Sequence, residues 1–73
     1  MKIRYDQQTD ILTVRLSERK IVDSDEPKPG VIVDFDGDGH VVGFEILDAS
    51  KVVPDFNTVT WEVEKVAAAA AGS

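Results

Sequence analysis

The residue types best suited to chemistry lie in one acidic segment. The spacing D-x-D-x-D-G-x5-E of an EF-hand calcium loop is complete there, at Asp34, Asp36, Asp38, Gly39 and Glu45. Carboxylate oxygens are the hard ligands that calcium prefers. An EF-hand loop joins two helices, however, and the preceding segment DEPKPGVIV contains two prolines, a glycine and several β-branched residues. We therefore interpret the segment as an acidic hairpin turn; a weak cation site and a true calcium loop are the alternatives.

The remaining residues offer little for catalysis. His40 is the single histidine and the chain has no cysteine, so one chain cannot build a zinc site of three or four nitrogen and sulfur ligands. Three serines lie in expected turns or charged segments, without the G-x-S-x-G context of a nucleophile: Ser17, Ser24 and Ser50. Acidic pairs such as Asp34 and Asp36 are expected to face solvent, where burial cannot raise a pKa for acid–base work. We predict no enzyme, no cofactor, and no catalytic, cofactor-binding or metal-ligating residues.

The strongest structural signal is the pattern VIVDFDGDGHVVGFEIL, in which two alternating runs flank an Asp-Gly pair. This pattern predicts a β-hairpin with Asp38 and Gly39 as the central residues of a type I′ turn. One face then carries the apolar pairs Val31–Ile46, Val33–Phe44 and Phe35–Val42. The other face carries Asp34, Asp36 and Glu45, with Glu45 across from Ile32. In this arrangement the complete calcium motif cannot wrap one ion.

A second hairpin is predicted at the N-terminus, where apolar and polar residues alternate over residues 2–5 and 12–16. A loop over residues 7–10 places three apolar pairs on one side: Met1–Leu16, Ile3–Val14 and Tyr5–Leu12. The opposite side carries Lys2, Arg4, Thr13 and Arg15. Lys2 then lies across from Arg15, and like charges so placed destabilise a sheet unless an acidic group lies near. We therefore expect a counter-charge on this face.

Three weaker elements complete the expected fold. Residues 21–26 are interpreted as an edge strand because the segment is poor in apolar residues and runs into Pro27 and Pro29. Asp48 is placed to cap a short helical turn over residues 49–52, which Pro54 must end. The alternating run TVTWEVE predicts a last strand with three apolar residues on one side: Val59, Trp61 and Val63.

These elements predict a mainly β fold, with a small α+β fold still possible. We expect an antiparallel meander of four or five strands, built from two β-hairpins, with a short helical turn after Asp48. One domain spans residues 1–66 and an alanine-rich tail follows over residues 67–73. A chain of 73 residues without cysteine has a thin core and no disulfides, so a partner subunit or a metal is the usual remaining support. We therefore predict a homodimer, with an exposed sheet edge or the Trp61 strand in its interface.

Four segments of the chain resemble one prokaryotic family. They are the opening K-I-R-Y-D, the strand ending in L-S-E, the segment P-G-V-I-V-D and the closing E-I-L-D-A-S. Together they resemble the bacterial and archaeal family known as domain of unknown function 2283, over about the first 51 residues. The family has no established activity, so the resemblance implies no site residues. It implies a small, stand-alone, cytoplasmic prokaryotic protein.

Net charge and hydropathy argue against two classes of protein, those that bind nucleic acid and those that span a membrane. The net charge of −6 argues against binding to the phosphate backbone of nucleic acids, which needs clustered lysine and arginine. No apolar run is long enough to span a membrane, so we expect a cytoplasmic protein. We predict a non-catalytic protein-interaction module acting as a homo-oligomer; a protein partner encoded nearby is a further candidate. The alternative is a small-ligand or cation-binding domain that uses the acidic hairpin from Asp34 to Glu45.

Overall fold

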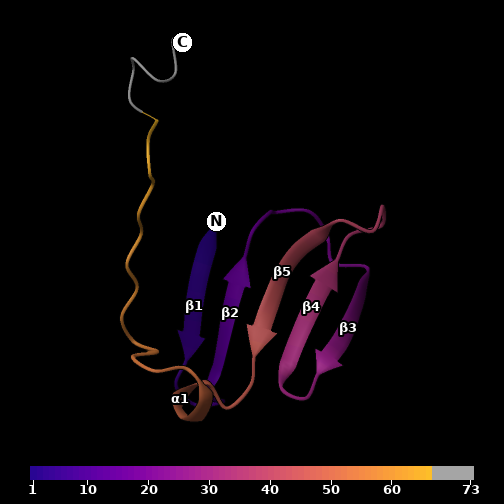
Figure 1. The fold of residues 1–73 in the computed structure, drawn as a ribbon. Coiled ribbons are helices and arrows are strands. Elements are labelled where there is room, and N and C mark those ends of the chain that lie inside the picture. The colour runs from indigo at the N-terminus through magenta and orange to yellow at the C-terminus, as the bar shows by residue number, and fades with distance from the viewer. Residues whose placement is uncertain (67–73) are drawn as a thin grey trace.

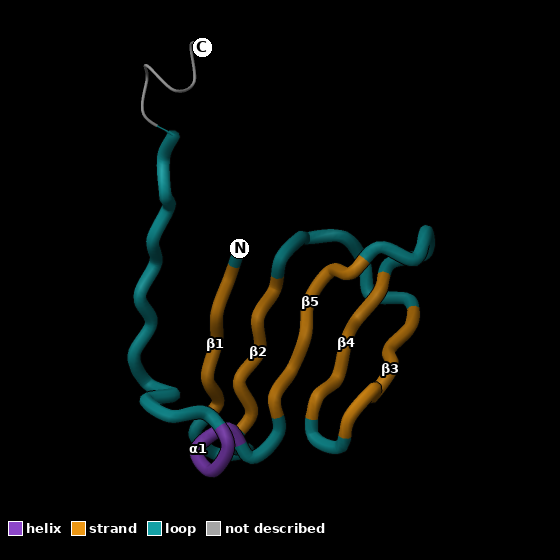
Figure 2. Tube along the Cα trace, in the orientation of Figure 1, coloured by secondary structure: helices purple, strands orange, loops and turns teal. Residues whose placement is uncertain are grey.

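Five antiparallel strands form a single sheet in the computed structural model, which describes residues 1–66 (Figure 1). The strands are β1 (Lys2–Asp6), β2 (Ile11–Arg15), β3 (Asp23–Lys28), β4 (Val31–Phe35) and β5 (Val41–Ile46). Their spatial order is β1-β2-β5-β4-β3, so the central strand β5 joins the N-terminal hairpin to the second one. A one-turn helix, α1 (Ala49–Val52), follows β5 at one end of the sheet (Figure 2). The prediction of a mainly β fold built from antiparallel hairpins is confirmed.

The N-terminal hairpin has the predicted register. Ile3 lies opposite Val14, Tyr5 opposite Leu12, and Lys2 opposite Arg15. The turn over residues 7–10 closes with a hydrogen bond of 2.8 Å from the Asp10 amide to the Asp6 carbonyl. Period-two alternation was sufficient here because a one-residue slip would move every apolar side chain to the polar face.

The second hairpin agrees with the prediction except at its turn. Val31 lies opposite Ile46 and Val33 opposite Phe44, as predicted, but Phe35 lies opposite Val41 instead of Val42. A type I′ turn needs a positive φ at both central residues, and Gly39 has a φ of 85° whereas Asp38 is not in that region.

The turn of this hairpin contains one more residue than predicted. The Gly39 amide donates to the Asp36 carbonyl at 3.2 Å, and the Asp36 amide donates to the His40 carbonyl at 2.9 Å. The loop is therefore Gly37-Asp38-Gly39, a type I turn followed by a left-handed glycine. A bulge next to Phe35 then restores the register, so that Asp34 lies opposite Gly43.

The predicted edge strand is an edge strand, but it begins two residues later, at Asp23. All six residues of β3 are exposed, and the register shifts between Asp25 and Lys28. Pro27 lies inside this shift, because a proline has no amide to donate to the ladder and is tolerated only at an edge or a bulge.

Helix α1 forms at the predicted residues, but Asp48 does not cap it. Asp48 has a φ of 52° and its side chain makes no capping hydrogen bond. The cap comes from Asp10 in the first hairpin: its two carboxylate oxygens accept hydrogen bonds from the Ser50 amide at 2.9 Å and the Ser50 hydroxyl at 2.7 Å. These bonds, with a further one from the Tyr5 hydroxyl, lower the pKa of Asp10. A residue far away in the sequence therefore fastens the helix to the sheet.

The predicted last strand is wrong. Residues 58–66 form no strand; they extend past β1 as an arm without a ladder of hydrogen bonds to it (Figure 1). We call these residues the C-terminal arm. The three apolar side chains of the predicted strand are 60%, 69% and 61% exposed at Val59, Trp61 and Val63. The alternation is that of a strand, but within residues 1–66 no second layer covers the arm. The alanine-rich tail, residues 67–73, lies outside the described residues.

The sheet separates polar from apolar side chains. The polar face carries Lys2, Arg4, Thr13, Arg15, Asp34 and Glu45, with the two apolar residues Ile11 and Ile32 among them; the apolar face carries Ile3, Tyr5, Leu12, Val14, Val31, Val33, Phe35, Phe44 and Ile46. Within residues 1–66, no helix is long and apolar enough to cross a membrane. The two faces are the candidate functional surfaces.

Candidate functional site

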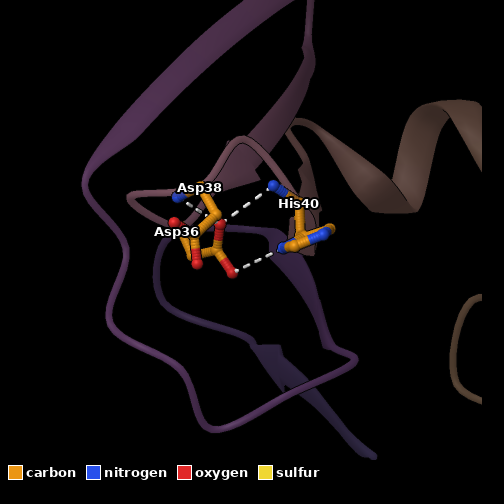
Figure 3. A group of neighbouring side chains, drawn as sticks. All are labelled: Asp36, Asp38 and His40. Atoms are coloured by element: carbon orange, nitrogen blue, oxygen red, sulfur yellow. Dashed lines mark hydrogen bonds and ion pairs between the residues drawn. The ribbon is translucent and has the colours of Figure 1, made fainter.

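The tip of the second hairpin brings three potential ligand side chains together. One ligand atom from each of Asp36, Asp38 and His40 lies within 4.8 Å of the others (Figure 3). Asp36 is only 6% exposed, and one of its carboxylate oxygens accepts hydrogen bonds of 2.9 Å from the backbone amides of Asp38 and His40. The side chains of Asp38 and His40 lie at the surface. The turn is thus built around the Asp36 carboxylate.

An arginine already offsets part of the negative charge of this cluster. Nε of Arg19 lies 3.2 Å from the second carboxylate oxygen of Asp36. A terminal guanidinium nitrogen of Arg19 lies 3.1 Å from a carboxylate oxygen of Asp38. Burial raises the pKa of Asp36, but the backbone hydrogen bonds from His40 and Asp38 and the charge of Arg19 outweigh it, so the pKa is lowered. The second carboxylate oxygen of Asp36 accepts no well-directed hydrogen bond, so its contact with Nε of Arg19 is an ion pair only. A metal ion at this cluster would have to displace the arginine.

A neighbouring arginine holds Arg19 in place. The guanidinium of Arg15 donates hydrogen bonds to the carbonyls of Ser17 at 2.8 Å and Arg19 at 2.6 Å. Arg15 extends from the end of β2, next to the central strand. The loop after β2 is therefore fixed on one side by Arg15 and on the other by the hairpin tip.

The complete calcium motif is not assembled at one place. Asp34 and Glu45 lie outside the cluster, and Glu45 is opposite Ile32, as predicted. The expectation that Asp34 and Asp36 face solvent is wrong, since they are 4% and 6% exposed. They lie at or next to β4, an inner strand, where side chains of neighbouring segments cover them. His40 belongs to the cluster although the calcium motif does not include it; the spacing i, i+2, i+4 around a hairpin turn is the signal that connects it to Asp36 and Asp38.

A second acidic pair lies on the polar face. Asp34 accepts a hydrogen bond of 2.6 Å from the Ser24 hydroxyl on the edge strand. Glu45 is diagonal to Asp34 across β4 and β5, within reach of a long side chain. Burial raises the pKa of Glu45, and Asp34 raises it further as a hydrogen-bond acceptor and as a like charge. The pair can share a proton, which the assumption of a solvated face did not predict.

Replacing Glu45 with glutamine is expected to stabilise the protein at neutral pH by roughly 0.5 kcal/mol, because it removes a like charge beside Asp34. In the natural chain the pKa of Glu45 is raised on folding, so its favourable contribution is present below its ordinary value of 4.5 and is lost as the pH rises through the raised pKa. Asp10 and Asp36 have the opposite pH dependence, because folding lowers their pKa values. Their contribution to the free energy of unfolding is present above the ordinary value of 3.8 and is lost as the pH falls below it.

Urea unfolding between pH 3.5 and pH 8 measures this dependence. The free energy of unfolding of the natural chain should fall as the pH rises above the ordinary pKa of glutamate. This fall should be absent in E45Q and present in the exposed control E62Q. A decline in E45Q as steep as in the natural chain would contradict the assignment of the shared proton to Glu45.

The counter-charge predicted for the basic end of the polar face is present in part. Glu18 borders a shallow hollow with Lys2, Arg4 and Arg15, and Glu45 borders a second hollow with Arg4. The polar face is thus basic over β1 and β2 and acidic over β4 and β5. Both hollows are open to solvent.

The apolar face is the more unusual surface. Among the described residues, only two apolar side chains are buried, Val42 and Ala49. Helix α1 and the loop after it cover one corner, where the ring of Phe56 lies 4.7 Å from that of Tyr5. At the other end of β1, Ile3 is 40% exposed. Large exposed apolar surfaces on small soluble domains mark interaction sites.

Comparison with known proteins agrees with the sequence resemblance. Residues 2–50 match the family described as "Protein of unknown function (DUF2283)". The chain belongs to this family. The DUF2283 segment contains all five strands and the start of α1. No solved structure matches the chain.

One relative extends the similarity beyond the DUF2283 segment. An uncharacterized protein of the archaeon Methanocaldococcus jannaschii is 38% identical over 68 residues, which is 89% of this chain and 53% of the relative. The chain therefore spans about half the length of this relative. A match over that share of 73 residues must continue past residue 50, so the similarity includes residues of the C-terminal arm.

Proposed function

We propose that the chain is a non-catalytic protein-interaction module that acts as a homo-oligomer, in which the apolar face of the sheet binds a second copy. The observation that carries this proposal is the uncovered apolar face. Ordering a residue costs about 1.5 kcal/mol, and burial returns only about 25 cal/mol per Å², so a domain with two buried apolar side chains has little net stability alone. A second layer supplies the missing burial.

A second copy fits this face because two apolar sheet faces complement each other. Sheets pack face to face at about 10 Å, with the side chains of the inner faces interdigitating. The result is a β-sandwich with one sheet from each chain. The polar face then points outward in both copies and remains free for another protein, for example one encoded nearby.

Cation binding at the acidic hairpin is the second candidate function. The clustering of Asp36, Asp38 and His40 favours it. The position of Arg19 opposes it, because the guanidinium group of this residue already contacts both carboxylates. The homo-oligomer is therefore the better-supported proposal.

Sedimentation of the purified chain at about 10 μM tests the homo-oligomer by mass action. We expect a species of at least twice 8.0 kDa. The variant Ile3→Lys, which places a charge on the apolar face at a position exposed in the single chain, should dissociate it. Glu18→Gln changes the net charge by the same one unit on the polar side and should leave it intact. A cooperatively folded species of 8.0 kDa in the natural chain would refute the proposal.

A further inference from the structure

The C-terminal arm is apolar on one side and unpacked. Trp61 and Val59 border a hollow of about 290 Å³ with Met1 and Ile3, so the arm lies beside β1. Even there Trp61 is 69% exposed. The side chains of Met1 and Ile3 connect the arm to the apolar face, and the two surfaces are therefore continuous.

The size of the sheet gives the arm a reason to contact the second copy. Five strands about 4.8 Å apart, each of five or six residues at about 3.3 Å, present roughly 400 Å² in projection. A standard interface buries about 800 Å² per partner. A tryptophan buries about 150–250 Å² of accessible surface, so Trp61 would enlarge the contact that each copy makes.

Charge on the apolar side limits how two sheets can face each other. Asp23 and Asp25 lie opposite Phe35 and Val33, so they project toward the apolar side at the β3 edge. A two-fold axis across the strands would place β3 against β3 and bring four carboxylates together. A two-fold axis along the strands places β3 of one copy over β1 and the arm of the other, and so avoids this repulsion.

The same axis also brings Trp61 to a matching hollow. The start of β1 and the end of β4 lie at the same end of the sheet, and rotation about an axis along the strands keeps them at that end (Figure 1). A hollow of about 480 Å³ lies there, with Val22 and Phe35 as its apolar walls and Asp23, Asp36, Gly37 and Gly39 around the rest of its border. Val22 is 63% exposed and forms an apolar wall of this hollow.

We propose that Trp61 of each copy packs into this hollow of the second copy, against Val22 and Phe35. The inference rests on the proposed homo-oligomer and names its contact. The two-fold axis makes the contact occur twice, so each arm packs against the β3 edge of the other sheet. Thr60 and Glu62, on the other side of the alternation, face away from the contact.

The dissociation constant of the dimer, measured by sedimentation over a concentration series, tests the contact. We expect Trp61→Ala to raise the constant at least tenfold, and the matched control Thr60→Ala to leave it unchanged. Val22→Ala should raise it as well. Because both side chains make one contact, the double variant W61A/V22A should be weakened by less than the product of the two single effects. If the double variant raised the dissociation constant by the full product of the two single effects, the side chains would act independently and the pairing would be overturned.

Fluorescence provides the second measurement, since Trp61 is the single tryptophan. Its emission should move to shorter wavelength as the concentration passes through the dissociation constant. A dimer whose tryptophan emission stays that of an exposed side chain would overturn this inference and leave the proposed function standing. A shifted emission that does not change with concentration would show that the arm packs on its own chain, which also overturns it. The absence of any dimer would refute both proposals.

Discussion

Replacing Phe44 with alanine is expected to lower the free energy of unfolding by about 3 kcal/mol, at the lower end of the range for buried phenylalanine. Phe44 lies on the central strand β5, opposite Val14 on one side and Val33 on the other. It therefore joins the two hairpins at the middle of the apolar face. Its side chain is half-buried in the single chain, and a second copy would complete its burial.

Urea unfolding at two protein concentrations measures this effect. The loss should be larger at the higher concentration, where the proposed dimer is populated. Val41→Ala is the matched control, because Val41 lies on the same strand and is 45% exposed; its loss should stay below about 0.5 kcal/mol. A loss under about 1 kcal/mol for F44A would contradict the central position of this residue in the core.

Replacing Gly43 with alanine should lower the free energy of unfolding by a similar amount, about 3 kcal/mol, which is the upper end of the range for overpacking. A Cβ at this position would lie 2.7 Å from the carbonyl oxygen of Val14, in the backbone of the adjacent strand. A side chain could rotate away from such a contact, whereas a hydrogen-bonded strand cannot. Gly43 lies just beyond the bulge, where β2 and β5 approach closely.

The matched control is Gly37→Ala. A Cβ there meets only a side-chain carbon of Val22 at 3.8 Å, and the residue does not have a positive φ. Thermal unfolding of the two variants should therefore separate them clearly, with G37A within a few degrees of the natural chain. Equal melting temperatures for G43A and the natural chain would show that the strands can move apart at no cost.

Period-two alternation, together with the turn residues, was enough to predict the hairpins. Ile3, Val14, Val33 and Phe44 all lie where their spacing placed them, because a strand offers only two faces and a slip by one residue exposes the whole apolar set. The resemblance to the DUF2283 family was likewise available from the residues alone. Proline and charge were sufficient to predict that β3 is an edge.

Contacts between segments far apart in the sequence decided the rest. Asp10 caps α1 in place of Asp48 because the first hairpin turn lies against the helix, a proximity that no local pattern encodes. Asp36 is buried because Arg19 and two backbone amides solvate its charge, although local alternation placed it on a polar face. Trp61 has the spacing of a strand residue, yet the arm forms no strand, since a strand needs a partner's hydrogen bonds and a layer to pack against. Sequence determined which side of each strand is apolar; only the tertiary structure determined which of those sides the chain covers itself and which it leaves open.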